Sequence, residues 1–103
     1  MITKEIIKSL LLKEFPKLEA DFKVKRIGLF GSYSTNQANE ESDIDLIIEF
    51  NEPIGLKFIN LCDYLEQLFD KKVDVLTPEG LKSIRVKSVI DNIINTVEYV
   101  EAA

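Results

Sequence analysis

The feature that most constrains this fold is the segment DIDLIIEF, residues 43–50, in which two aspartates alternate with aliphatic residues. Successive side chains of a strand point to opposite faces, so Asp43 and Asp45 share one face and the alternating aliphatic residues share the other. A strand that buries its aliphatic face and presents two neighbouring carboxylates is built like a divalent-metal site. The segment therefore predicts a core strand and, at its start, a candidate metal site.

A second motif, Gly31-Ser32, ends the apolar segment Val24–Phe30, and ten residues separate it from Asp43. Glycine at a strand end permits unusual backbone angles, so the amides that follow can point at a phosphate. The Ser32 hydroxyl can donate to a phosphate oxygen, and a helical turn over residues 34–38 would add a favourable field for anions. The chain has no histidine to activate Ser32 as a nucleophile, so a phosphate-binding turn is the favoured interpretation.

A third carboxylate lies downstream, in the predicted strand Val73–Leu76. Asp74 faces away from the flanking valines, so it joins Asp43 and Asp45 on one face if the two strands are neighbours. Two like charges about 4 Å apart repel by roughly 4 kcal/mol near a protein surface, which makes such a trio costly without cations. Oxygen ligands of this kind suit Mg²⁺ or Mn²⁺, and two ions could serve an attacking and a leaving oxygen.

Each motif has a plainer interpretation when it is taken alone. A lone Asp-x-Asp is more often a solvated strand edge, and a lone Gly-Ser is weaker evidence still. The combination at this spacing, with Asp74 downstream, favours the metal site. Glu49 shares the aspartate face, where a surface role is favoured over one beside the metal.

The remaining sequence predicts an α/β (α+β) fold with a small mixed sheet flanked by helices, in a single domain over residues 1–103. The evidence is apolar residues at helical or alternating spacing, bounded by proline and glycine. The other predicted elements are a helix from Thr3 to about Phe15, a break at Pro16 with a short second helix to Phe22, a helix over 55–69, a helix over 81–96 and a short strand over 97–100.

Composition narrows the function further. The single Cys62 allows no internal disulfide, and no apolar run approaches the roughly 20 residues that span a bilayer, so we expect a cytoplasmic protein without membrane contact. The net charge of -5 disfavours direct nucleic-acid binding and is compatible with a basic protein partner or with carboxylates gathered around metal. The absence of histidine removes imidazole ligands and a histidine base.

The combined motifs carry a family resemblance over nearly the whole chain. Gly31-Ser32, ten residues and then Asp43-Ile44-Asp45 match the signature of the nucleotidyltransferase superfamily that includes DNA polymerase beta. The segments IGLFGSY, ESDIDLIIEF and KKVDVLT resemble the minimal nucleotidyltransferase (MNT) antitoxins, which are paired with HEPN-domain toxins. The resemblance implies a polymerase beta-like core and hetero-oligomeric assembly with such a toxin.

The resemblance also implies a role for each motif residue. Asp43 and Asp45 would hold two Mg²⁺ ions, and Asp74 would bind metal and help to deprotonate the acceptor hydroxyl. Gly31 and Ser32 would hold ATP. The implied reaction transfers AMP from ATP to a tyrosine hydroxyl of the toxin, which silences its RNase activity.

One departure from the family pattern affects the nucleotide-binding turn. Many members carry Ala-Arg-Gly where this chain has Ser34-Thr35-Asn36, so a cation near the phosphates or an anchor of the loop is missing. All three carboxylates remain, so we expect the activity to persist with altered nucleotide affinity.

Two other functions stay open on the sequence. The chain could neutralise its toxin by binding and occlusion alone, or it could transfer a nucleotide to a small molecule or an RNA end. With 103 residues there is little beyond the metal-bearing sheet, so we expect a partner protein to supply the acceptor and part of the pocket.

Overall fold

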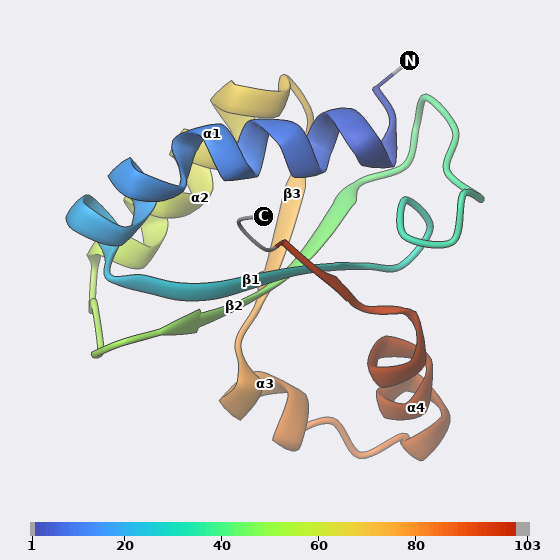
Figure 1. Ribbon diagram of the computed structural model, residues 1–103. Helices are drawn as coiled ribbons and strands as arrows, with labels where there is room; N and C mark the ends of the chain where they lie inside the picture. Colours follow the sequence, from blue (N-terminus) through green and yellow to red (C-terminus); the bar gives the residue numbers. More distant parts are fainter. Residues whose placement is uncertain (1, 101–103) are drawn as a thin grey trace.

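The computed structural model describes residues 2–100, which form four helices and four strands within that range. Their order along the chain follows the predicted alternation of helices and strands (Figure 1). The elements are α1 (Lys4–Phe22), β1 (Val24–Phe30), β2 (Ile44–Phe50), α2 (Lys57–Phe69), β3 (Val73–Leu76), α3 (Pro78–Lys82), α4 (Lys87–Thr96) and β4 (Glu98–Tyr99).

The strands form one mixed sheet in the order β3-β2-β1-β4. β1 runs antiparallel to both β2 and β4, whereas β2 runs parallel to β3. A parallel pair needs a crossover connection, and α2 supplies it between β2 and β3. The prediction of a small mixed sheet flanked by helices is confirmed.

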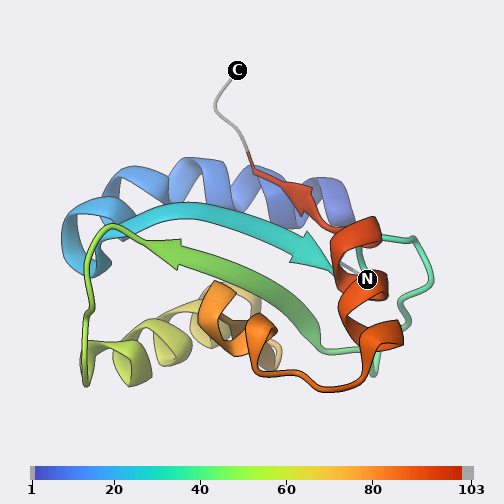
Figure 2. The same cartoon turned by 90° about the horizontal axis from the view of Figure 1, so that it is seen from below.

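The sheet separates two layers of helices. α1 and α2 cover one face, and α3 and α4 lie on the other side, as Figures 1 and 2 show. The core lies between α1, α2 and the sheet, because the apolar stripes of both helices meet the aliphatic face of β2. Burying each such side chain contributes about 1.5–3 kcal/mol. The fully buried members of these three elements are Ile7, Leu11, Leu18, Ile44, Leu46, Ile48, Leu61 and Leu65.

The predicted break at Pro16 is wrong, because α1 continues through it as one helix of 19 residues. A proline inside a helix costs about 3 kcal/mol, since it removes one backbone hydrogen bond and crowds the preceding turn. Leu11 and Leu18, on either side of Pro16, are both 0% exposed. We attribute the continuity of α1 to these contacts, which hold both halves of the helix against the sheet.

The single helix predicted over residues 81–96 is also wrong, because two helices occupy this region. Pro78 starts α3, and the Thr77 side chain accepts a hydrogen bond from the Gly80 amide at 3.1 Å. Proline suits the first helical position, where no partner exists for its missing N–H. Residues 83–86 then separate α3 from α4.

Smaller differences concern boundaries. β2 begins at Ile44, one residue after the predicted start, and α2 begins at Lys57 rather than near Gly55. The short strand predicted over residues 97–100 is present as β4, which pairs with β1 at the edge of the sheet. No helix within residues 2–100 is long and apolar enough to cross a membrane.

Candidate metal and nucleotide site

Asp45 and Asp74 occupy paired positions on the parallel strands β2 and β3. Asp43 directly precedes β2, two residues before Asp45. The predicted alternation is present, because Ile44 and Leu46 are both 0% exposed whereas Asp45 is half-buried. The sequence analysis placed Asp74 beside Asp43 and Asp45 on the condition that their strands are neighbours. β2 and β3 are neighbours in the sheet, so this condition is met.

Asp45 meets an unfavourable electrostatic environment. Burial, followed by the charges of Asp74 and Asp43, raises the pKa of Asp45 from an ordinary 3.8 to about 6. Desolvation and like charges both penalise the ionised carboxylate. A cation bound between these side chains would relieve this penalty, and it would be attracted by the same charges.

The donor chemistry fits a hard divalent cation, because carboxylate oxygens are the preferred ligands of Mg²⁺. Within residues 2–100, however, no three acidic or cysteine side chains already form a complete metal cage. Carboxylates without a cation repel one another, and Mg²⁺ usually takes one or two of them and fills its shell with water and phosphate. The assignment of Asp43, Asp45 and Asp74 as ligands stays a prediction.

Gly31 brings the second motif against the first. Phe30 pairs with Asp45 in the antiparallel ladder, so Gly31 follows directly beside that carboxylate. A Cβ atom on Gly31 would collide with Asp45 Oδ2. Gly31 also has φ +74°, a backbone conformation that other residues adopt only with strain. Glycine is therefore required here by both backbone conformation and space.

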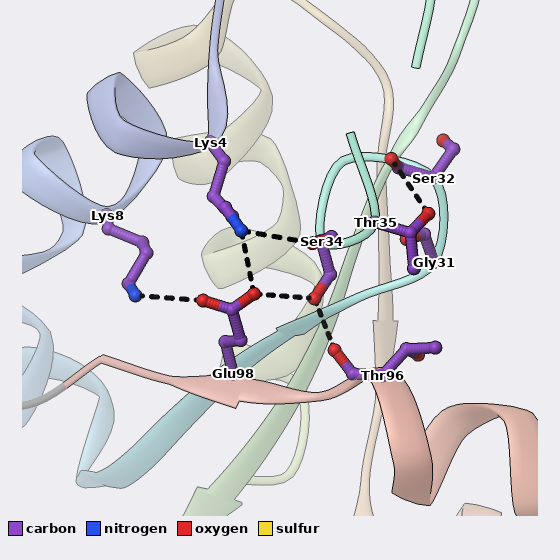
Figure 3. Close-up of polar contacts among 8 residues, drawn as sticks. All are labelled: Lys4, Lys8, Gly31, Ser32, Ser34, Thr35, Thr96 and Glu98. Carbon is purple, nitrogen blue, oxygen red and sulfur yellow. Dashed lines mark hydrogen bonds and ion pairs between the residues drawn. The ribbon is translucent and has the colours of Figure 1, made fainter. Parts of the chain in front are cut away.

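Backbone hydrogen bonds close a tight turn after Gly31. The amides of Ser34 and Thr35 donate to the Gly31 carbonyl at 3.1 and 3.2 Å, and the Gln37 amide donates to the Ser32 carbonyl at 2.8 Å. The Thr35 hydroxyl also lies 3.3 Å from the Gly31 carbonyl oxygen and 3.4 Å from the Ser32 carbonyl oxygen, and Figure 3 shows the contact with Ser32. This network fixes the path of the chain immediately beside the aspartates.

The turn differs from the predicted one in position. No helical segment is assigned over residues 34–38, and the turn instead occupies residues 32–36. Within residues 2–100, the amides of Ser32 and Tyr33 are not among the donors of the backbone bonds that close this turn. Two successive amides that do not close the turn, directly after a glycine, are candidates for binding an anion without a helix N-terminus.

The aspartates lie on an accessible part of the sheet. The Asp74 side chain is exposed, so a second reactant can approach it. A cavity of about 600 Å³ opens at the other end of β2, where Glu49, Glu52, Pro78 and Lys82 are among its lining residues. None of the predicted site residues lines this cavity. Glu49 forms ion pairs with Lys25 and Arg26, in agreement with its predicted surface role.

Sequence reasoning missed a polar cluster next to the turn, formed by Lys4, Lys8, Ser34 and Glu98. The one local signal is that Lys4 and Lys8 stand four residues apart, which places them on one face of a helix. Nothing in the sequence links them to Glu98, because their contact depends on the position of β4.

A sequence model of the nucleotidyltransferase domain matches residues 8–100. The chain belongs to this nucleotidyltransferase family. It is 41% identical over 95 residues to protein adenylyltransferase MntA of Thermococcus cleftensis, which covers 91% of this chain and 96% of that protein. It is 42% identical over 92 residues to a candidate protein adenylyltransferase of Methanocaldococcus jannaschii, with 88% and 94% covered.

Solved structures agree with this nucleotidyltransferase fold. A candidate minimal nucleotidyltransferase superimposes with a TM-score of 0.71 at 22% identity, covering 94% of this chain and 95% of that one. A chain from a toxin–antitoxin structure with AMP-PNP has a TM-score of 0.63 at 22% identity, with 99% and 75% covered. A chain from the complex of a tri-AMPylated Shewanella oneidensis HEPN toxin with its MNT antitoxin also gives 0.63, at 18% identity, with 98% and 74% covered.

Proposed function

We propose that this nucleotidyltransferase is a Mg²⁺-dependent protein adenylyltransferase that serves as the antitoxin of a toxin–antitoxin pair. It transfers AMP from ATP to a tyrosine hydroxyl of a HEPN-domain toxin and assembles with that toxin. The observation that carries the proposal is the strand register, which pairs Asp45 with Asp74 and sets Gly31 beside Asp45. This register places the proposed phosphate-binding turn next to the paired carboxylates.

Gly31 and Ser32 hold the triphosphate in this proposal. The amides of Ser32 and Tyr33 bind phosphate oxygens, and the Ser32 hydroxyl donates a further hydrogen bond. Gly31 allows a phosphate to approach Asp45 closely, because no side chain stands between the turn and that carboxylate. The bound triphosphate is thereby oriented toward the aspartates before the reaction begins.

Asp43, Asp45 and Asp74 hold the magnesium in this proposal. Two Mg²⁺ ions, when bound, would supply positive charge to the attacking and leaving oxygens of the phosphoryl transfer. Asp74 accepts the proton of the tyrosine hydroxyl, a role for which its exposure is suitable. The tyrosine oxygen forms a bond to the α-phosphorus, the bond to pyrophosphate breaks, and AMP remains on the toxin.

The choice of acceptor rests on the relatives. Two relatives that are 41% and 42% identical to this chain carry the name protein adenylyltransferase, one of them as a candidate. Structures of similar fold come from toxin–antitoxin complexes, one with an AMPylated HEPN toxin. The exposed position of Asp74 leaves room for a partner to bring its tyrosine to the site.

Intact-mass spectrometry tests the proposal directly. The protein encoded beside this chain, which the proposal expects to be a HEPN-domain toxin, is incubated with the chain, ATP and Mg²⁺. We expect the toxin to gain one or more AMP units and to lose RNase activity. Asp43→Asn should abolish the gain, because it removes a ligand of the metal.

Asp63→Asn provides the matched control, because Asp63 is an exposed aspartate on α2. It removes the same charge without touching the site, and it should transfer AMP at the wild-type rate. A toxin that is inhibited in a stable complex but gains no mass would refute catalysis in favour of occlusion. Label on RNA or on a small molecule, with none on the toxin, would refute the protein acceptor.

A further inference from the structure

Ser34 is a buried polar residue inside the turn that follows Gly31. Its side chain is 4% exposed. The hydroxyl donates a hydrogen bond to the Thr96 carbonyl and lies 3.4 Å from Glu98 Oε2. Thr96 ends α4, where the last carbonyls of a helix have no partner within the helix. The hydroxyl therefore satisfies a helix end and ties the turn to it.

Two lysines of α1 complete the cluster (Figure 3). Lys4 Nζ donates to the Ser34 carbonyl at 3.2 Å and to Glu98 Oε2 at 2.8 Å. Lys8 Nζ lies 3.3 Å from Glu98 Oε1. One lysine thus binds both the backbone of the turn and the carboxylate, so Ser34 is held through its hydroxyl and through its carbonyl.

The sheet places the cluster next to the candidate site. Glu98 pairs with Leu29 across β1 and β4, two residues before Gly31. On the other side of β1, Phe30 pairs with Asp45. The chain segment that leads into the turn is consequently held between the aspartate strand and the strand that carries Glu98.

We propose that Ser34 and Glu98, with Lys4, are positioning residues that hold the Gly31-Ser32 turn in the conformation that binds a nucleoside triphosphate. The inference rests on the proposed function, in which this turn receives the phosphates. A turn that is already ordered loses less conformational entropy when the ligand binds. The cluster acts through the backbone of the turn and does not itself touch the nucleotide.

Direct nucleotide binding is the experiment that tests the inference. The affinity of the full chain for AMP-PNP with Mg²⁺ is measured for the wild type, Ser34→Ala and Glu98→Gln. We expect each variant to bind about three- to tenfold more weakly, as the loss of one net hydrogen bond predicts. Where transfer is measured, KM for ATP should rise while kcat stays within about twofold, because the reacting groups are unchanged.

The matched controls are Ser88→Ala and Glu19→Gln, which make the same chemical changes at exposed positions of α4 and α1. Both controls should keep wild-type affinity. Amide hydrogen exchange provides a second readout in the nucleotide-free protein. The amides of Ser34 and Gln37, which close the turn, should exchange faster in Ser34→Ala than in Ser88→Ala.

The outcomes separate this inference from the proposed function. If both cluster variants fold and bind AMP-PNP as the wild type does, the inference is refuted, and the cluster is a stabilising element only. If the wild type binds AMP-PNP but modifies no toxin, the proposed acceptor fails while the affinities of the variants still decide the inference. If the wild type binds no nucleotide, both are refuted together.

Discussion

Asp45 and Glu98 lie on opposite sides of β1, one register position apart, and they meet opposite electrostatic surroundings. Burial and the charges of Asp74 and Asp43 raise the pKa of Asp45 to about 6. A hydrogen bond from Lys4, together with Lys8, lowers the pKa of Glu98. Among residues 2–100, two lysines form ion pairs with Glu98, whereas no lysine or arginine forms one with Asp45.

This difference in electrostatic surroundings distinguishes a carboxylate with a structural role from carboxylates that are suited to bind a ligand. Glu98 has its counter-charges built in, so it can stabilise the fold without any ligand. The three aspartates have no ion-pair partner among residues 2–100, so a cation from outside would be needed to compensate their charge. The presence or absence of a neighbouring cation thus indicates which carboxylates stabilise the fold and which are candidates for binding a cation.

The largest expected effect comes from Asp45→Asn. This variant removes a carboxylate whose ionised form is disfavoured by burial and by two neighbouring like charges. We expect AMP transfer to fall by more than about a hundredfold, because the proposed metal ligand is lost. In metal-free buffer the free energy of unfolding should stay level or rise, since repulsion from Asp74 and Asp43 is relieved. Transfer assays and urea denaturation measure the two quantities, and transfer that persists in this variant would contradict the ligand assignment.

Gly31→Ala tests how closely the turn and Asp45 fit together. We expect a loss of about 1–3 kcal/mol in unfolding free energy from strain at positive φ, together with weaker AMP-PNP binding. Gly55→Ala is the matched control, because Gly55 also has positive φ, at +57°, but a Cβ there would meet nothing within 4 Å. It should lose stability and keep nucleotide affinity. Equal affinity in the two variants would contradict the close approach of Gly31 to the site.

Glu98→Gln tests the stabilising role of Glu98 through the pH dependence of the unfolding free energy. The folded pKa of Glu98 lies below its ordinary 4.5, so its contribution to stability is present above pH 4.5 and disappears as the pH falls through the folded pKa. The groups that face it are Lys4, Lys8 and Ser34. Denaturation at neutral and acidic pH should show a smaller acid-induced loss in Glu98→Gln than in Glu19→Gln. Equal losses would mean that the pairing stabilises nothing measurable.

The smallest effect is expected from Tyr33→Phe. Tyr33 is 2% exposed, and its hydroxyl has no hydrogen-bond partner within residues 2–100, whereas the hydroxyl of the adjacent Ser34 is bonded. Leaving a buried hydroxyl unpaired costs about 1–3 kcal/mol. Tyr33→Phe should therefore keep or slightly raise the unfolding free energy, while Ser34→Ala lowers it. A clear loss in Tyr33→Phe would show that a water satisfies the hydroxyl.

Local patterns account for what the sequence predicted well. The bounds of β1 and β3 match the predicted strands, because short apolar runs bounded by polar and glycine residues determine them. The neighbouring positions of Asp45 and Asp74 followed from alternation plus one assumption about strand order, which the structure confirms.

Longer-range contacts account for what it missed. The start of α3 at Pro78 had a local signal in the Thr77 cap, whereas the continuity of α1 through Pro16 depends on packing that no window of the sequence contains. The anchoring of Ser34 was missed for the same reason. The replacement of Ala-Arg-Gly by Ser34-Thr35-Asn36 suggested a loop without its anchor, but Lys4 and Glu98 reach this turn from distant parts of the chain.

The contact between Lys4 and Glu98 spans 94 residues, which has a consequence for synthesis. A ribosome makes the aspartate strand and the glycine turn when β4 does not yet exist. The emerging chain can pair β1 with β2 and can close the turn through local backbone hydrogen bonds. The contacts of Lys4 and Ser34 with Glu98 form only after Glu98 has left the exit tunnel, because long loops close late in folding. By this reasoning, the nascent protein would acquire its full proposed affinity for ATP only after β4 has emerged.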